Sequence, residues 1–259
     1  MNHLAWFSML KKLRPYYFPF IGVFVLLTIW QFTALWLQTT EPATAALAPI
    51  PTAFKLLELI QSGEIFSHIV ASVLRVFFGL IFALVVGVPV GLLLGLSKNF
   101  ELMSVMTFQL VRMVSPLAWM PIAVLIFGIG NAPILFLLAI GGVWPTLLNT
   151  SIGVKQVAPS FIELSKSLAA TPWEILRTIV FPSMLVFSLT GLRLTLAVLW
   201  VVLVPAEMLG VDNGLGYFIV DAKDRLAYSE LTAGIVVISV IGWLLDYLMR
   251  QILKLAQKQ

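Results

Sequence analysis

Cysteine is absent from the 259 residues, and charged residues make up only 11% of them, whereas 60% are hydrophobic. The absence of cysteine excludes a disulfide scaffold and thiolate metal sites. A typical soluble protein is about 25% charged, so this composition excludes a water-soluble globule. The two histidines, His3 and His68, are too few and too far apart in sequence to indicate a metal centre.

The chain also has little net charge. The chain has 16 basic and 12 acidic residues, which gives a net charge of +4. So small a basic excess is typical of the orientation bias of a membrane protein rather than of a nucleic-acid surface. We therefore expect membrane lipid, and no nucleic acid, among the partners.

Long apolar runs are abundant. A helix needs about 20 apolar residues to cross roughly 30 Å of hydrocarbon. Six stretches approach or exceed this length: 18–37, 76–96, 102–129, 134–154, 183–207 and 231–249. The third is interrupted by Arg112, Pro116 and Pro121. These runs predict an all-α, polytopic integral membrane bundle of about six helices, in a single domain that covers residues 1–259.

Basic residues are distributed unequally between the two sides of the membrane. Six spans place both termini on one side, together with Lys11, Lys12, Arg14, Lys98, Lys155, Lys166, Arg177, Arg250, Lys254 and Lys258. The other side has only Lys55, Lys223 and Arg225 clear of the spans, with Arg75 at the start of the second. Because cytoplasmic loops retain Lys and Arg, we predict that both termini are cytoplasmic, in a bacterial inner membrane.

The basic stretch before the first apolar run could also indicate a cleavable signal peptide. An apolar run of about 20 residues fits a membrane anchor better. After this run, Pro49 and Pro51 precede a stretch in which Phe54, Leu57 and Ile60 recur at helical spacing. This pattern predicts a short amphipathic helix in the outer interface.

The segment 157–182 is too polar to span the membrane, yet it contains two helix-start signals. Pro159 can occupy the first turn of one helix. Thr171-Pro172-Trp173-Glu174 combines an N-cap hydroxyl, a proline at the first position and a glutamate three residues after the cap. We predict two short helices joined near Ala170, the second ending at Pro182.

The first of these helices is amphipathic. Phe161, Leu164 and Leu168 line one face, whereas Glu163 and Lys166 are left for water. The residues alone leave two interpretations open: a helical loop that packs on lipid headgroups, or a docking element.

This segment resembles the cytoplasmic loop of the transmembrane subunits of binding-protein-dependent ABC importers. The family pattern is E-A-A, three residues, G, nine residues and I-x-L-P. Here 163–165 (ELS) stands for E-A-A, Ala169 for the glycine, and 179–182 (IVFP) for I-x-L-P. Both alanines and the glycine of the pattern are replaced.

Four further blocks are similar to the branch of that family which imports nitrate, bicarbonate, cyanate, taurine and aliphatic sulfonates. They are SPLAWMPIAVLIFGIG (115–130), WPTLLNTSIGV (144–154), TGLRLTLAVLWVVLVPAEML (190–209) and GLGYFI (214–219). The resemblance covers about residues 65–250. It identifies the family far more specifically than the substrate.

The resemblance implies a permease subunit of an ATP-driven importer, which is not itself an enzyme. Such a subunit pairs with a second copy, receives substrate from an extracytoplasmic binding protein, and is driven by two cytoplasmic ATPase subunits that bind ATP and Mg. In agreement, the sequence contains no G-x-x-x-x-G-K-[ST] phosphate loop. We expect no cofactor and no metal in this chain.

In the family, the loop helix docks in a groove on the ATPase. On this basis we expect the coupling residues to be Glu163, Lys166, Ala169, Ala170, Thr171 and Pro172. A small residue at positions 169 and 170 is what a close approach to the partner requires.

Arg112 and Arg193 fall near the middle of predicted spans. A charge at bilayer depth costs on the order of 3 kcal/mol or more and usually faces a partner or an aqueous path. A guanidinium can hold an oxoanion through forked hydrogen bonds. Alternatively, each arginine is neutralised by Glu207, Glu101 or a helix C-terminal carbonyl and holds the bundle together.

Prolines within the apolar runs predict broken helices, whose free backbone groups can line a cavity. With the polar and aromatic residues nearby, they suggest a translocation path. The candidate path residues are Arg112, Trp119, Trp144, Asn149, Arg193 and Glu207. Gly87, Gly91 and Gly95, spaced by four, predict a close contact between helices instead.

Other classes of function fit less well. A secondary transporter or channel for a small solute would be expected to show inverted repeats or an acidic proton relay, and the spans show no such relay beyond Glu207. A membrane enzyme would need a nucleophile or metal cluster that the sequence lacks. The expected function is a permease subunit that forms the path for a small oxoanion.

Overall fold

A computed structural model describes the backbone of residues 3–256 and the side chains of Phe18 and residues 20–256. This part of the chain is helical throughout and has no strand. In chain order, the elements are α1 (His3–Gln38), the 3-10 helix η1 (Pro42–Leu47), α2 (Pro49–Ser62), α3 (Glu64–Leu96), α4 (Lys98–Met113), the 3-10 helix η2 (Pro116–Trp119), α5 (Met120–Phe127), α6 (Asn131–Lys155), α7 (Pro159–Ser167), α8 (Pro172–Ile175), the π turn η3 (Leu176–Val180), α9 (Phe181–Glu207), α10 (Leu215–Asp224) and α11 (Tyr228–Ala256). The all-α prediction is confirmed.

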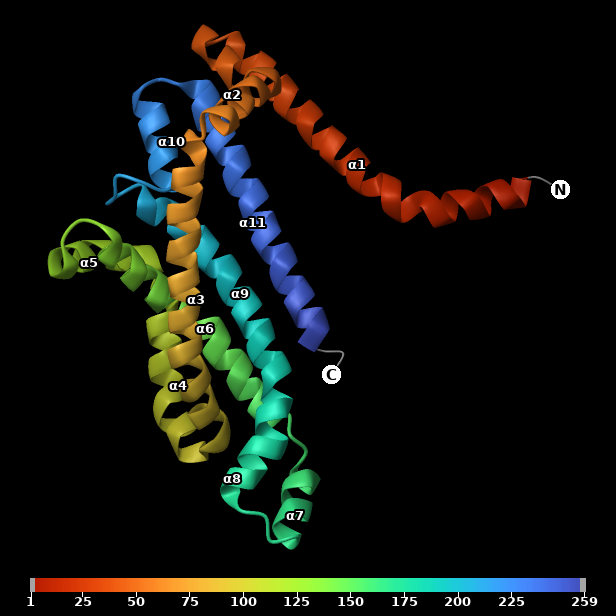
Figure 1. Cartoon of the computed structure of the whole chain (residues 1–259), viewed down its shortest axis with the longest axis vertical. Helices are drawn as coiled ribbons and strands as arrows, with labels where there is room; N and C mark the ends of the chain where they lie inside the picture. Colours follow the sequence, from red (N-terminus) through yellow and green to blue (C-terminus); the bar gives the residue numbers. More distant parts are fainter. Residues whose placement is uncertain (1–2, 257–259) are drawn as a thin grey trace.

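Five helical stretches of the described residues are long and apolar enough to cross a membrane: α1, α3, α6, α9 with the turn before it, and α11. The bent pair of α4 with η2 and α5 adds a sixth if it is counted as one span. In Figure 1, α3, α6 and α9 run side by side through the centre, while α1 projects away from them. The bundle therefore has the number of spans that the apolar runs predict.

The centre of the bundle is the contact of α3 and α9 with α6. A methyl group added at Gly91 would collide with the backbone carbonyl of Leu147, and one at Gly87 would lie 3.1 Å from Thr146. Only glycine allows the α3 backbone to approach α6 this closely. The helix contact predicted from the spaced glycines is confirmed.

The third predicted span, 102–129, is not a single helix. α4 ends at Met113, Val114 is extended, and η2 begins at Pro116. The direction of the chain changes by 84° between α4 and the segment formed by η2 and α5. Proline has no N–H and disfavours helical geometry in the residue before it, so the chain turns at Ser115. The break that the interrupting prolines predict in this run is confirmed.

The polar segment between the fourth and fifth spans forms two short helices, α7 and α8, as predicted. However, the second does not end at Pro182. Helical structure continues from Pro172 through the π turn η3 into α9, which gives 36 residues up to Glu207. The wider π turn relieves the clash between the ring of Pro182 and the turn before it.

The amphipathic helix predicted near the outer interface is α2. It packs on α11, where the hydroxyls of Thr52 and Thr232 lie 2.7 Å apart and Lys55 Nζ lies 3.0 Å from Glu230. Hydrogen bonds to Glu58 and then to Glu230 raise the pKa of Lys55 above its ordinary value. α10, which the sequence patterns do not predict, lies at the same end of the molecule (Figure 1).

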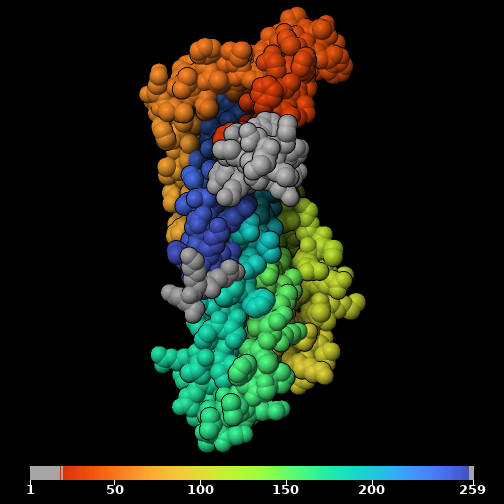
Figure 2. All heavy atoms as spheres, turned by 90° about the vertical axis from the view of Figure 1, so that its right-hand side faces the viewer, coloured from red at the N-terminus to blue at the C-terminus, as the bar shows by residue number. Residues whose placement is uncertain are grey.

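The opposite end is formed by α7 and α8, which extend beyond the C-terminal end of α11 (Figures 1 and 2). Lys155, the last residue of α6, forms an ion pair of 2.5 Å with Glu101 in the first turn of α4. Lys98 begins α4. The loop of α7 and α8 and the basic ends of α4 and α6 thus belong to the same end of the molecule.

Candidate functional site

The side chains of α7 leave an apolar face uncovered. Phe161, Leu164 and Leu168 are 61%, 59% and 76% exposed. Their spacing places them on one side of the helix, at the tip of the molecule that projects past the spans (Figure 1). A contiguous exposed apolar face of this kind marks an interaction site. We call these three residues the α7 face.

The turn after α7 explains the small residue at position 169. The N–H of Ala170 bonds to the carbonyl of Ser165, and the N–H of Ala169 bonds to that of Lys166. This is the Schellman arrangement, which requires a left-handed residue at the first position after the cap. Ala169 occupies it with φ of +58°. Glycine, which the family pattern has here, suits this conformation better.

Ala169→Gly is therefore expected to stabilise the turn. The left-handed conformation costs an alanine about 1 kcal/mol relative to glycine. The amide of Ala170, which closes the turn, should exchange with solvent about fivefold more slowly, measured by hydrogen–deuterium exchange. Ala170→Gly serves as the control, because position 170 is not left-handed. Equal protection in both variants would contradict the backbone explanation.

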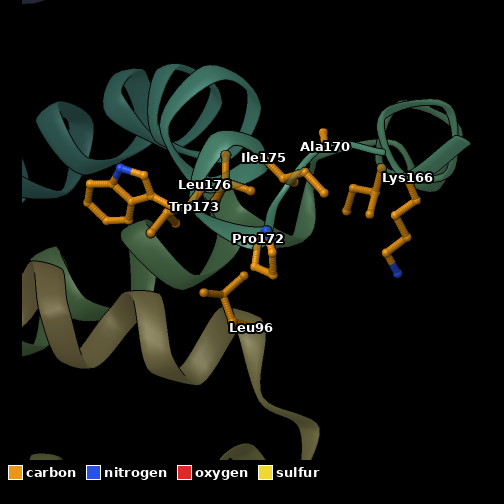
Figure 3. A pocket seen from close by; sticks show the side chains of 9 residues that line it. Leu96, Lys166, Ala170, Pro172, Trp173, Ile175 and Leu176 are labelled. Carbon is orange, nitrogen blue, oxygen red and sulfur yellow. The ribbon is translucent and has the colours of Figure 1, made fainter. Parts of the chain in front are cut away.

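A groove of about 490 Å³ lies between this loop and the end of α3. Its lining residues are Leu96, Ile162, Lys166, Ala170, Pro172, Trp173, Ile175, Leu176 and Val180. In Figure 3, the side chains of Leu96 and Pro172 point toward one another. Of the predicted coupling residues, Lys166, Ala170 and Pro172 thus line the side toward the membrane spans.

The remaining predicted coupling residues have other positions. Glu163 is exposed on α7. Thr171 caps α8: its hydroxyl accepts a hydrogen bond from the N–H of Glu174 at 3.3 Å, and its own N–H donates to Glu174 Oε2 at 2.7 Å. The capping box predicted from the sequence is confirmed. Five of the six predicted coupling residues are exposed, as is the α7 face, so both stay candidates for partner contact.

Arg112 lies in the last turn of α4, and its side chain is exposed. With a rise of 1.5 Å per residue, it lies about 21 Å along the helix from Lys98. Among the described side chains it makes no ion pair and no hydrogen bond. Glu101, one of its suggested partners, binds Lys155 instead.

Arg193 holds two spans together. Its Nε lies 2.7 Å from Asp246 on α11, and Asp246 also pairs with Arg250 at 2.5 Å. The interpretation of Arg193 as a bundle contact is supported, but the suggested partners Glu207 and Glu101 are wrong. An acidic residue inside the last apolar run was the signal that could have identified Asp246.

The most deeply buried ion pair of the described residues involves Arg75, for which the sequence patterns predict no role in a site. Arg75 on α3 is 5% exposed and its Nη1 lies 2.6 Å from Oε1 of Glu207, which is 0% exposed. Ser72 Oγ lies 2.8 Å and 2.9 Å from the two carboxylate oxygens, and the N–H of Gly216 donates to Oε2 at 2.9 Å. Glu207 is thus fully enclosed.

This ion pair lies toward the end of the bundle opposite α7 and α8. Arg75 is about 32 Å along α3 from Leu96, which is close to the thickness of the hydrocarbon core. The loop between α9 and α10 closes over the ion pair at Gly214, whose φ is +111°. A Cβ added to Gly214 would lie only 2.5 Å from Arg75 Nη1. Arg75 therefore lies inside the bundle, about one hydrocarbon thickness along α3 from the end of the molecule that holds α7 and α8.

The other predicted path residues do not converge. The indole N–H of Trp119 is buried without a partner among the described residues. Trp144 contacts Phe108 on α4, with ring centroids 5.5 Å apart. Asn149 Nδ2 donates to the carbonyl of Pro145 one turn earlier at 2.8 Å. With Arg193 and Glu207 in separate ion pairs, the six candidates do not form one site.

Residues 87–258 match the family of binding-protein-dependent transport system inner membrane components. The chain belongs to this family. Over 244 residues it is 32% identical to a bicarbonate transport system permease protein, CmpB, of Synechococcus elongatus, covering 91% of this chain and 87% of the relative. It is 34% identical to the taurine transport system permease protein TauC of Escherichia coli, with coverage of 86% and 82%.

The fold is similar to that of a chain of the inward-facing MetNI methionine ABC transporter. The TM-score is 0.58, with 19% sequence identity and coverage of 71% of this chain and 92% of that chain. Together with the family match, this confirms the expected importer-permease fold and function. The chain is a multi-pass component of the inner membrane. No group of three His, Asp or Glu side chains suited to a metal is found in the described residues.

Proposed function

We propose that this chain is one of two identical permease subunits of an ATP-driven importer, and that it forms the path for a small oxoanion such as bicarbonate, nitrate or a sulfonate. The bicarbonate and taurine permeases, similar over most of their length, support this substrate class. The whole chain, 1–259, acts as a single permease domain. An extracytoplasmic binding protein delivers the anion.

The α7 face carries the proposal, because the chain leaves three large apolar side chains exposed at its tip. A cytoplasmic ATPase subunit covers this face and transmits the energy of ATP hydrolysis through α8 into α9, with which it is helically continuous. Each of two ATPase subunits binds one permease. ATP and Mg are held by those subunits.

The proposed orientation in the membrane is based on the end of the molecule that holds α7 and α8. Lys98, Lys155 and the loop with α7 lie together there, and basic residues remain on the cytoplasmic side. Both termini are then cytoplasmic. α2 and α10, at the other end, face the binding protein.

The anion path passes Arg112 and the bend at Ser115. Backbone groups freed by a broken helix are tolerated at bilayer depth only where they face protein or an aqueous cavity. Arg112 adds an exposed positive charge without a partner among the described side chains, directly before this break. Its charge offsets the desolvation cost of the passing anion.

Reconstitution tests the function. The permease, its ATPase and its binding protein are placed in proteoliposomes, and uptake of labelled bicarbonate, nitrate and taurine is measured. We expect uptake of at least one anion that requires ATP, and ATP hydrolysis that the loaded binding protein stimulates. Uptake that proceeds without ATP would indicate a secondary transporter or channel and would contradict the proposal.

Arg112→Gln should lower anion uptake about tenfold or more, because glutamine keeps donors but loses the fixed charge. Because Arg112 has no buried partner to strand, assembly and basal ATP hydrolysis should be unchanged. Lys98→Gln, which removes a charge at the start of the same helix, is the matched control and should transport normally. Normal uptake by Arg112→Gln would exclude the path role.

A further inference from the structure

A recess of about 340 Å³ opens at the outer end of the bundle, between α3, α6 and the loop before α10. Its polar lining comes from Arg75, Asn131 and Asn213. Its other walls are apolar side chains of α3 and α6. We call it the Arg75 recess. No residue of the α7 face or of the Arg112 region contributes to it.

The acceptor atoms of this lining are already used. Arg75 Nε donates to Asn131 Oδ1 at 2.8 Å, and Nη2 donates to Asn213 Oδ1. Nη1 donates to Glu207 Oε1 at 2.6 Å and to the carbonyl of Asn213 at 2.9 Å. Arginine has five N–H groups, so one on Nη2 is left. The amide nitrogens of Asn131 and Asn213 have no partner in the described part of the chain.

The polar atoms around the recess that have no partner among the described residues are therefore hydrogen-bond donors, whereas both asparagine side-chain oxygens already accept a bond from Arg75. The carboxylate of Glu207 is fully buried and accepts bonds from Ser72, Arg75 and Gly216, so it offers no acceptor to a ligand. Asn131 is also the first residue of α6, a 25-residue helix. Its N-terminal N–H groups add positive potential. A lining whose unpartnered groups are donors suits an oxyanion.

We propose that the Arg75 recess binds an oxyanion group through Arg75 Nη2 and the amide nitrogens of Asn131 and Asn213. Its place at the outer membrane boundary allows two sources for this group. One is the transported anion, held after release from the binding protein, and this source rests on the proposed function. The other is the phosphate of an outer-leaflet phospholipid.

Asn131→Asp and Asn213→Asp test the site. Each change keeps the side-chain oxygen that accepts from Arg75 but replaces the free donor with a negatively charged oxygen. Asn131→Asp also places an acid at a helix N-terminus, which favours folding. Ser67→Asp is the control: it adds the same charge to an exposed position about 12 Å along α3 from Arg75.

The purified permease–ATPase complex in the phosphate-free detergent dodecyl maltoside is titrated with bicarbonate, nitrate or taurine, and its thermal unfolding is followed. We expect at least one anion to raise the Tm of the wild type and of Ser67→Asp, with apparent affinity at least tenfold weaker in both asparagine variants. If only added phosphatidylglycerol produces this pattern, the site is supported with phospholipid as its source.

Equal responses of the wild type and both asparagine variants to every anion and to phosphatidylglycerol would overturn the site, as would no response in any of them. This binding measurement does not depend on transport. Failure of ATP-driven uptake in the wild type would contradict the proposed function alone, so the two failures are distinguishable.

Discussion

Arg75→Leu is expected to destabilise the protein by about 3–5 kcal/mol, because it strands the buried carboxylate of Glu207. The pair is almost fully enclosed and links α3 to the end of α9. Loss of one partner should appear as a lower Tm of the purified complex or as loss of the folded protein from the membrane. Arg225→Met is the control, because Arg225 is half-exposed and the less exposed of its two partners, Glu230, keeps its ion pair with Lys55. An exposed ion pair is worth about 1 kcal/mol or less.

A double variant separates charge from packing. Arg75→Leu with Glu207→Leu leaves no charge buried, and apolar replacement of a buried pair is often tolerated. We expect the double variant to recover a large part of the stability lost in Arg75→Leu. A double variant that is as unstable as the sum of its single changes would show that the two residues act independently.

Leu168→Asp should reduce ATP-driven uptake to background. A carboxylate at the C-terminal edge of the α7 face would have to be desolvated against the ATPase, while the free permease should fold normally because Leu168 is 76% exposed. Copurification of the ATPase and its stimulation by the loaded binding protein measure the effect.

Leu226→Asp is the matched control for this prediction. Leu226 is 68% exposed at the turn between α10 and α11, at the opposite end of the molecule. The Leu226→Asp variant should retain the bound ATPase. If Leu226→Asp loses the ATPase while Leu168→Asp keeps it, then the orientation in the membrane is the reverse of that proposed.

Local patterns predicted the elements of this molecule well. Thr171 and Glu174 form the capping box that their spacing indicates, and the glycines of α3 make the close contact with α6. The same patterns failed at Pro182. This proline does not end the helix that begins with α8, because the π turn η3 before it accommodates its ring and the helix continues into α9. The spacing of the apolar residues predicted an amphipathic helix at α7, but only the structure shows that its apolar face is uncovered.

The sequence by itself determined that this protein is a helical membrane protein, because run length, basic-residue distribution and helix caps act over a few turns of chain; the permease function came from the resemblance of its motifs to importer subunits. Tertiary structure alone decided which charges meet. Arg75 and Glu207 are 132 positions apart, and their pairing depends on how α3 packs beside α9. The same packing leaves Arg112 exposed and gathers unused donors around the Arg75 recess, since a side chain's partners are set by the helices that surround it.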